Sequence, residues 1–316
     1  MRQAILKLPE QFTFNALIHQ PEQFKPAHRM VVGGMGGSAL PAELWQRLRP
    51  TTPLVVHRDY GLPTLDDNWW VSSLWVASSY SGQTEETLDF AAACQARGLN
   101  WLAIASGGRL LEVAKAARRP YIQLPAGWPP RLALGLGLRA LASLMADDAL
   151  DQEMVALAPQ LKPAALEADG HDLATKLHGR VPIIYSSDLN RTLAYNWKIK
   201  FNETSKVPAW ANVVPELNHN EWQGFAARPL GFQPHFIFII DPDDHQRVRR
   251  RFEAMGVWLE KNNWPMTVIT LSGETVLEKL FRNLILADWT ALFLAEAGGV
   301  EPMPVPLIEE FKKSII

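Results

Sequence analysis

Short apolar runs alternate with longer amphipathic segments along most of the chain. The runs are bounded by glycine, serine or aspartate, as strands commonly are, and the longer segments have apolar positions at helical spacing. The pattern predicts strands at residues 29–33, 54–57, 74–78, 101–105, 121–124, 181–186, 236–241 and 266–270. It predicts helices that end near residue 49 and that span residues 84–97, 109–118, 131–147, 189–204, 244–262 and 275–298. This alternation predicts an α/β fold with doubly wound parallel sheets flanked by helices on both faces.

A polar stretch rich in alanine and aspartate interrupts the alternation at residues 147–172, and no strand is predicted there. The pattern of strands and helices starts again at residue 181. The length of 316 residues suits two domains of ordinary size. We therefore predict two domains, residues 1–150 and residues 151–316, with an irregular stretch at residues 206–224 in the second.

The composition is that of an ordinary globular protein, with 47% apolar and 20% charged residues. The formal net charge is −2, so the chain has no general attraction for nucleic acid or for an anionic membrane. The single cysteine, Cys94, excludes an internal disulfide and a zinc site built on several thiolates. Lys7 and Pro9 interrupt the N-terminal segment before a signal-peptide core, and no apolar run is long enough to cross a bilayer. We expect a soluble, cytoplasmic protein with no nucleic-acid or membrane partner.

The sequence Gly33-Gly-Met-Gly-Gly-Ser-Ala39 lies between the first predicted strand and the first predicted helix. Its glycines allow the backbone to approach a ligand, and the helix that follows offers free N–H donors, a combination typical of phosphate sites. Gly34, Gly36 and Ala39 also match the dinucleotide fingerprint G-x-G-x-x-A. Asp59 is the nearest candidate for the acidic residue that this fingerprint requires. The loop alone leaves a nucleotide, another phosphate ligand and a purely structural turn open.

A second loop, Ser78-Ser-Tyr-Ser-Gly-Gln-Thr84, follows the strand at residues 74–78 and precedes a helix. The hydroxyl groups of Ser79, Ser81 and Thr84 can bind phosphate oxygens together with backbone N–H groups. A structural alternative exists, because serine or threonine followed by glutamate also forms a capping box. Both loops lie at the carboxyl ends of strands, where open parallel sheets bind ligands. Together they favour a small phosphorylated ligand.

Four further sequence motifs follow the two loops along the chain. They are Pro130-Arg-Leu-Ala-Leu-Gly135, Phe201-Asn-Glu-Thr-Ser-Lys-Val-Pro-Ala-Trp210, Pro215-Glu-Leu-Asn-His-Asn-Glu221 and a tail that begins Gly299-Val-Glu-Pro-Met-Pro-Val305. The two loops resemble the sugar isomerase (SIS) superfamily, and the further motifs are similar to those of the bifunctional phosphoglucose/phosphomannose isomerases. The resemblance covers residues 33 to 312 and implies two SIS-type domains. It implies an isomerase without cofactor or metal that interconverts glucose 6-phosphate, and mannose 6-phosphate, with fructose 6-phosphate.

Aldose–ketose isomerisation needs a base that moves a proton between C1 and C2, a group that opens the sugar ring, and a cation beside the developing enediolate. The resemblance makes Glu203 the base and Arg131 the cation. It makes His219 the ring-opening group, donated by the partner subunit of a homodimer. The resemblance also implies a tail lysine that reaches the sugar, and Lys312 aligns better with the family than Lys313. The expected ligands of the 6-phosphate are Gly36, Gly37, Ser38, Ser79, Ser81 and Thr84.

The residues also limit other chemistries. Glu216 and His219 form half of a di-iron carboxylate motif, but the sequence has no second copy, so no metal site is expected. Met303 stands where the family's tail often has threonine, which leaves mannose 6-phosphate turnover open. A non-catalytic SIS sugar-phosphate sensor is one alternative, although it would not need Glu203, His219 and Arg131 together. An isomerase of a different sugar phosphate and a nucleotide-dependent oxidoreductase are the others.

Overall fold

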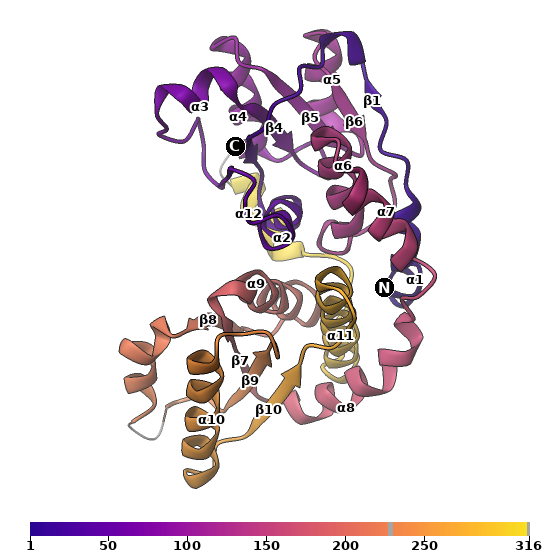
Figure 1. Ribbon diagram of the computed structural model, residues 1–316. Coiled ribbons are helices and arrows are strands. Elements are labelled where there is room, and N and C mark those ends of the chain that lie inside the picture. The colour runs from indigo at the N-terminus through magenta and orange to yellow at the C-terminus, as the bar shows by residue number, and fades with distance from the viewer. Residues whose placement is uncertain (227–229, 315–316) are drawn as a thin grey trace. The chain divides into compact units, whose positions relative to one another are not determined.

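The computed structural model describes residues 1–226 and 230–314. The chain forms two compact units. The first unit is residues 7–161, and the second combines residues 1–6 with residues 162–316. Each unit contains its own β-sheet with helices packed against it (Figure 1).

The first unit is built on a six-stranded sheet. Its strands are β1 (Ile18–His19), β2 (Met30–Gly33), β3 (Leu54–His57), β4 (Leu74–Ser78), β5 (Trp101–Ala105) and β6 (Tyr121–Gln123). Its helices are α2 (Leu40–Leu48), α3 (Asp67–Ser72), α4 (Glu85–Ala96), α5 (Gly108–Ala116), α6 (Leu134–Met145) and α7 (Asp148–Leu157). The spatial order of the strands is β1-β6-β5-β4-β2-β3, and all neighbours are parallel except β1 with β6. α7 packs against α6 and lies within this unit, which ends at residue 161.

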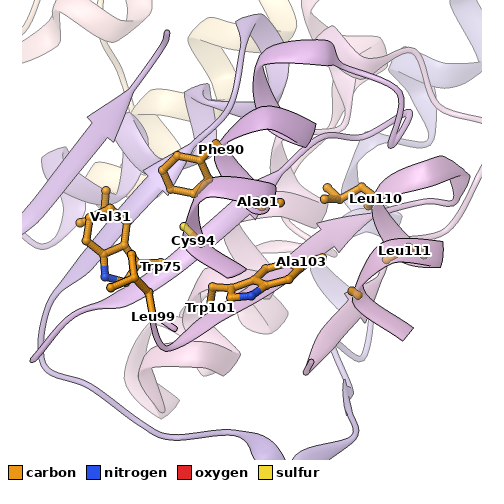
Figure 2. Packing of buried hydrophobic residues seen from close by; sticks show 13 residues of the cluster. Val31, Trp75, Phe90, Ala91, Cys94, Leu99, Trp101, Ala103, Leu110 and Leu111 are labelled. Carbon is orange, nitrogen blue, oxygen red and sulfur yellow. The ribbon is translucent and has the colours of Figure 1, made fainter. Parts of the chain in front are cut away.

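The centre of this sheet packs against α4 through large apolar side chains (Figure 2). Trp75 of β4 and Trp101 of β5 are partners across neighbouring strands, and both are almost fully buried. Phe90 and Cys94 are one turn apart on α4 and belong to the same cluster. Burial raises the pKa of the Cys94 thiol far above its ordinary value, so Cys94 is an inert core residue. The packing fixes the sheet from which both predicted ligand loops emerge.

The second unit is built on a four-stranded parallel sheet. Its strands are β7 (Val181–Ser187), β8 (Trp210–Val214), β9 (Pro234–Ile240) and β10 (Met266–Thr270), in the order β10-β9-β7-β8. Its helices are α1 (Arg2–Leu6), α8 (Glu167–Leu177), α9 (Arg191–Lys200), α10 (Gln246–Lys261), α11 (Val276–Ala297) and α12 (Pro306–Ser314). α10 covers a sheet face that carries Tyr185 and Phe236, and α11 packs against both α8 and α9.

The predicted α/β fold with parallel sheets is confirmed, and all eight predicted strands are present. The structure adds β1, and it adds β8 within the stretch at residues 206–224, which was predicted to be irregular. The helix predicted at residues 189–204 ends as an α-helix at Lys200 and continues as a π-helical turn, η7 (Phe201–Ser205). Among the described residues, no helix is both long enough and apolar enough to cross a membrane.

Candidate functional site

The strand order of the first unit places the two ligand-type loops side by side. β2 lies between β3 and β4, and the chain passes from β2 to β3 on one side before it returns to β4 on the other. Such a reversal leaves a crevice at the carboxyl ends of β2 and β4, where doubly wound sheets bind ligands. Residues 34–39 leave β2 at this point, and residues 79–84 leave β4.

Hydrogen bonds join the two loops directly. The Tyr80 amide donates to Ser38 Oγ at 2.9 Å, and Ser78 Oγ donates to the Ser38 carbonyl at 3.0 Å. Gly34 also packs closely against the start of the second loop, because a Cβ atom there would lie 2.6 Å from the Ser78 carbonyl oxygen. The two loops therefore form one continuous surface at the crevice, on which a single small ligand can contact both.

The second loop is held in shape by its own hydroxyl groups. Ser79 is 1% exposed, and its Oγ pairs with Thr84 Oγ1 at 2.8 Å and accepts from the Gly82 amide at 3.1 Å. Gly82 has φ +68°, and a Cβ atom there would lie 1.9 Å from the Gly107 carbonyl oxygen, so only glycine fits. Ser81 is exposed and Thr84 is half-buried at the start of α4. The hydrogen bonds of Ser79 thus hold the loop backbone that carries Ser81 and Thr84, the two residues that can contact a ligand.

Arg131 lies beside the first loop. It belongs to a 3-10 turn, η4 (Pro130–Leu132), and is 2% exposed. A Cβ atom at Gly37 would lie 2.7 Å from the Pro130 carbonyl oxygen and 3.0 Å from the Arg131 amide, so the loop and the turn are in contact. The buried Gln11 holds this turn, because its Nε2 donates to the Leu132 carbonyl at 2.8 Å. The structure therefore places the turn that carries Arg131 against the first phosphate-type loop.

Tyr80 also supports this arrangement, although no sequence motif singled it out. Its hydroxyl donates to the Pro125 carbonyl at 2.8 Å and accepts from the Trp128 amide at 2.9 Å. Burial raises the pKa of Tyr80, and the hydrogen bond from Trp128 offsets part of that rise, so the phenol stays protonated at neutral pH. Tyr80 therefore connects the second loop to the segment that leads into Arg131.

Glu203 lies in the π-helical turn η7 of the second unit and is half-buried. Contacts with α11 hold the turn at both ends. Before it, the buried Lys200 ammonium pairs with the buried Asp288 carboxylate at 2.5 Å. Within it, Ser205 Oγ donates to the Ala291 carbonyl at 2.8 Å. These contacts fix the backbone of Glu203, and a fixed backbone is what an oriented base requires.

Glu203 lines a pocket of about 380 Å³ within the second unit. The other lining residues are Asn202, Lys206, Val207, Pro208, Val305, Pro306, Leu307 and Ile308. Most of this wall is apolar, and the pocket is within the size range of small-molecule sites, about 300–1,000 Å³. A carboxylate on an apolar wall is a chemically reasonable position for a base.

His219 lies beyond the carboxyl end of β8, in the 3-10 turn η8 (Glu216–His219), and is exposed. Its ring makes no hydrogen bond within residues 1–226 and 230–314. Glu221 holds the following segment, because its carboxylate accepts from Tyr185 Oη of β7 and from Asn212 Nδ2 of β8, each at 2.5 Å. Burial, and then the Glu221 carboxylate, raise the pKa of Tyr185 far above its ordinary value. The sequence offered Glu221 only as part of a motif.

Lys312 is exposed on α12, where its Nζ donates to Glu309 Oε1 of the same helix at 2.9 Å. Lys313 is exposed as well.

The predicted site residues fall into two groups, one in each unit. At the carboxyl edge of the first sheet lie Gly36, Gly37, Ser38, Ser79, Ser81, Thr84 and Arg131. The second unit holds Glu203, His219 and Lys312.

Within residues 1–226 and 230–314, no group of three or more His, Cys, Asp or Glu side chains is arranged to hold a metal ion. Glu216, the partner of His219 in the half motif, instead accepts from Asn220 Nδ2 at 2.8 Å.

Known proteins resemble this chain along both units. A family model described as the bacterial phospho-glucose isomerase C-terminal SIS domain matches residues 166–315. The bifunctional phosphoglucose/phosphomannose isomerase of Aquifex aeolicus is 33% identical, over 92% of this chain and 91% of the relative. The protein of the same name from Caldicellulosiruptor bescii is 31% identical, over 100% of this chain and 98% of the relative.

A solved structure shares the fold. Glucosamine-6-phosphate deaminase from Thermotoga maritima matches with a TM-score of 0.68 at 16% identity, over 96% of this chain and 97% of that chain. At this identity the match shows a common architecture and nothing about the reaction.

Proposed function

Because the chain belongs to the bifunctional phosphoglucose/phosphomannose isomerase family, we propose that it interconverts glucose 6-phosphate and mannose 6-phosphate with fructose 6-phosphate. The observation that carries the proposal is the convergence of two phosphate-type loops and a buried arginine at the carboxyl edge of one sheet. A phosphorylated sugar provides an anion for the loops and a carbonyl carbon for the acid–base chemistry.

The first unit binds the 6-phosphate in this proposal. Backbone N–H groups of Gly36 and Gly37 and the hydroxyl groups of Ser38, Ser81 and Thr84 contact the phosphate oxygens. Ser79 acts indirectly, because its hydroxyl group bonds to Thr84 and to the Gly82 amide. Removing that hydroxyl group should therefore weaken sugar-phosphate binding less than removing a direct ligand. The loops contain no Lys or Arg, and Arg131 is the cation that the proposal places beside the reacting carbons.

The catalytic steps require residues from both groups. His219 takes the proton from the O1 hydroxyl and returns a proton to the ring oxygen, which opens the ring. Glu203 then removes the C2 proton of the aldose and delivers it to C1, while O1 gains and O2 loses a proton. Arg131 stabilises the intermediate enediolate by its charge, and Lys312 binds a sugar hydroxyl. No step changes the total number of protons or electrons.

A homodimer completes the site in this proposal, with His219 supplied by the partner subunit. The exposure of His219 and the lack of a hydrogen-bond partner for its ring within the described residues support a role outside its own subunit. Glu203→Gln and His219→Asn homodimers are expected to be nearly inactive. A heterodimer of the two variants, isolated with two different tags, contains one site with both wild-type residues and should regain about half of the wild-type activity. Heterodimers as inactive as their parents would exclude the shared site.

A coupled assay for fructose 6-phosphate tests the reaction itself. We expect turnover of glucose 6-phosphate and mannose 6-phosphate, with kcat in the range common for enzymes, about 1–10³ s⁻¹, and unchanged by EDTA. Met303, 42% exposed in the tail, is the residue to exchange for threonine if glucose 6-phosphate alone reacts. Saturable binding of both sugar phosphates without turnover of either would contradict the proposal and favour a sensor.

A further inference from the structure

Lys206 joins the two walls of the Glu203 pocket. One wall comes from residues 202–208 and the other from residues 305–308 of the C-terminal tail. The Lys206 ammonium donates to the Glu301 carbonyl at 2.6 Å, across 95 positions of the sequence. The same ammonium donates to the Glu203 carbonyl at 2.8 Å. One side chain therefore contacts both the backbone of the proposed base and the backbone of the tail.

The backbone conformation of Lys206 explains how its side chain reaches both segments. Lys206 has φ +56° and directly follows the π-helical turn that carries Glu203. A left-handed residue at a helix end reverses the chain, and a lysine there can bond to the last free carbonyls. Lys206 does so at Glu203 and, at 3.3 Å, at Thr204. An ammonium has three N–H donors, and the third is directed to the tail.

The tail depends on contacts of this kind for its direction. Among the described residues of α12, from Pro306 to Ser314, no side chain is buried. Two further prolines lie between Glu301 and Pro306, and each fixes its φ and lacks an N–H donor. A stiff segment that is held at Glu301 transmits its direction to α12. That helix carries Lys312, the proposed sugar-binding lysine.

We propose that Lys206 is a positioning residue that couples the Glu203 segment to the C-terminal tail and so holds the base and α12 in one arrangement. This proposal rests on the proposed roles of Glu203 and Lys312. The competing explanation is that Lys206 only caps the end of the π-helical turn. The two explanations differ in one respect: a cap acts without the tail, whereas a coupling residue requires it.

A double-mutant cycle with a shortened tail separates the two explanations. Lys206→Met in the full chain should lower kcat about 10- to 100-fold, because small displacements of catalytic groups have effects of this size. Its KM should change by less than about threefold, since the phosphate loops lie in the other unit. In a chain that lacks residues 301–316, and with them the contact at Glu301, the same substitution should lower kcat by less than about twofold. Lys206→Arg, which keeps the donors, should restore most of the activity.

Lys198→Met is the matched control. Lys198 lies on α9, and its ammonium is 5.6 Å from the Tyr195 ring centroid. The substitution removes the same charge, and kcat should stay within about twofold of wild type. An equal loss of kcat from Lys206→Met in the full and shortened chains would overturn the coupling and leave only the cap. No loss of kcat in the full chain would overturn it as well.

Amide hydrogen exchange tests the coupling without reference to activity. Lys206→Met should speed exchange in a peptide covering residues 299–312 by at least about tenfold, and Lys198→Met should leave it unchanged. An unchanged tail peptide in Lys206→Met overturns the proposal whether or not the protein is an isomerase. Faster exchange in a protein that converts no sugar phosphate would contradict the proposed function and leave the contact between Lys206 and the tail intact.

Discussion

Replacing Glu203 by glutamine should lower kcat about 10²–10⁴-fold, the usual cost of losing a general base. Glutamine keeps the shape of the side chain and its place in η7, which contacts with α11 hold. KM should change little, because the phosphate loops belong to the first unit and remain intact. The coupled fructose 6-phosphate assay measures both constants.

Glu260→Gln serves as the control for this substitution. Glu260 is exposed on α10 and does not line the Glu203 pocket. Its replacement should leave kcat within about twofold of wild type. If Glu203→Gln behaves in the same way, another residue moves the proton and the role proposed for Glu203 is wrong.

Gly82→Ala should destroy the second phosphate loop. The new Cβ atom would lie 1.9 Å from the Gly107 carbonyl oxygen, and alanine would be strained at φ +68°. A shift of Gly82 would disturb the hydrogen bond from its amide to Ser79 Oγ, and a shift of Gly107 would disturb the neighbouring Ser106, which donates to the Tyr80 carbonyl. We expect KM for the sugar phosphate to rise by at least about tenfold, since binding common to substrate and transition state is lost. Overpacking should also lower the free energy of unfolding.

Gly98→Ala isolates the conformational part of this effect. Gly98 has φ +66°, almost the value at Gly82, but no atom lies within 4 Å of its Cβ position. It should lose about 1–2 kcal/mol of unfolding free energy from strain alone, with KM unchanged. Gly82→Ala should lose about 1–3 kcal/mol more by urea denaturation. Equal losses in the two variants, with equal KM, would show that the contact between residues 82 and 107 does not shape the site.

Local sequence signals predicted the two phosphate-type loops and every strand except β1 and β8. Each loop is one continuous stretch of sequence, residues 33–39 and residues 79–84, and each follows an apolar run. The identities of neighbouring residues were therefore sufficient to predict both loops. β8 lacked such a signal, because Trp210 is exposed and the polar Asn212 interrupts the apolar positions. Its pairing with β7, and not its own pattern, makes it a strand.

The supporting residues of the site escaped prediction for a related reason. Gln11 bonds to the Leu132 carbonyl across 121 positions of the sequence, and Lys206 bonds to the Glu301 carbonyl across 95. Such contacts form only when the chain has folded, and no local sequence pattern predicts them. Glu203, His219 and Lys312 were identified by resemblance and not by pattern, because a single glutamate, histidine or lysine has many ordinary positions in a folded chain.

The reaction of glucose 6-phosphate in D₂O, followed by proton NMR, tests the central claim most directly. The proton that Glu203 takes from C2 can exchange with solvent deuterium before Glu203 protonates C1, so deuterium should appear at C1 of fructose 6-phosphate and its C1 proton signal should weaken. Glu203→Gln should slow this incorporation by the same factor as kcat, about 10²–10⁴-fold. Fructose 6-phosphate that forms without deuterium, or exchange that Glu203→Gln leaves at the wild-type rate, would contradict a Glu203-mediated proton transfer.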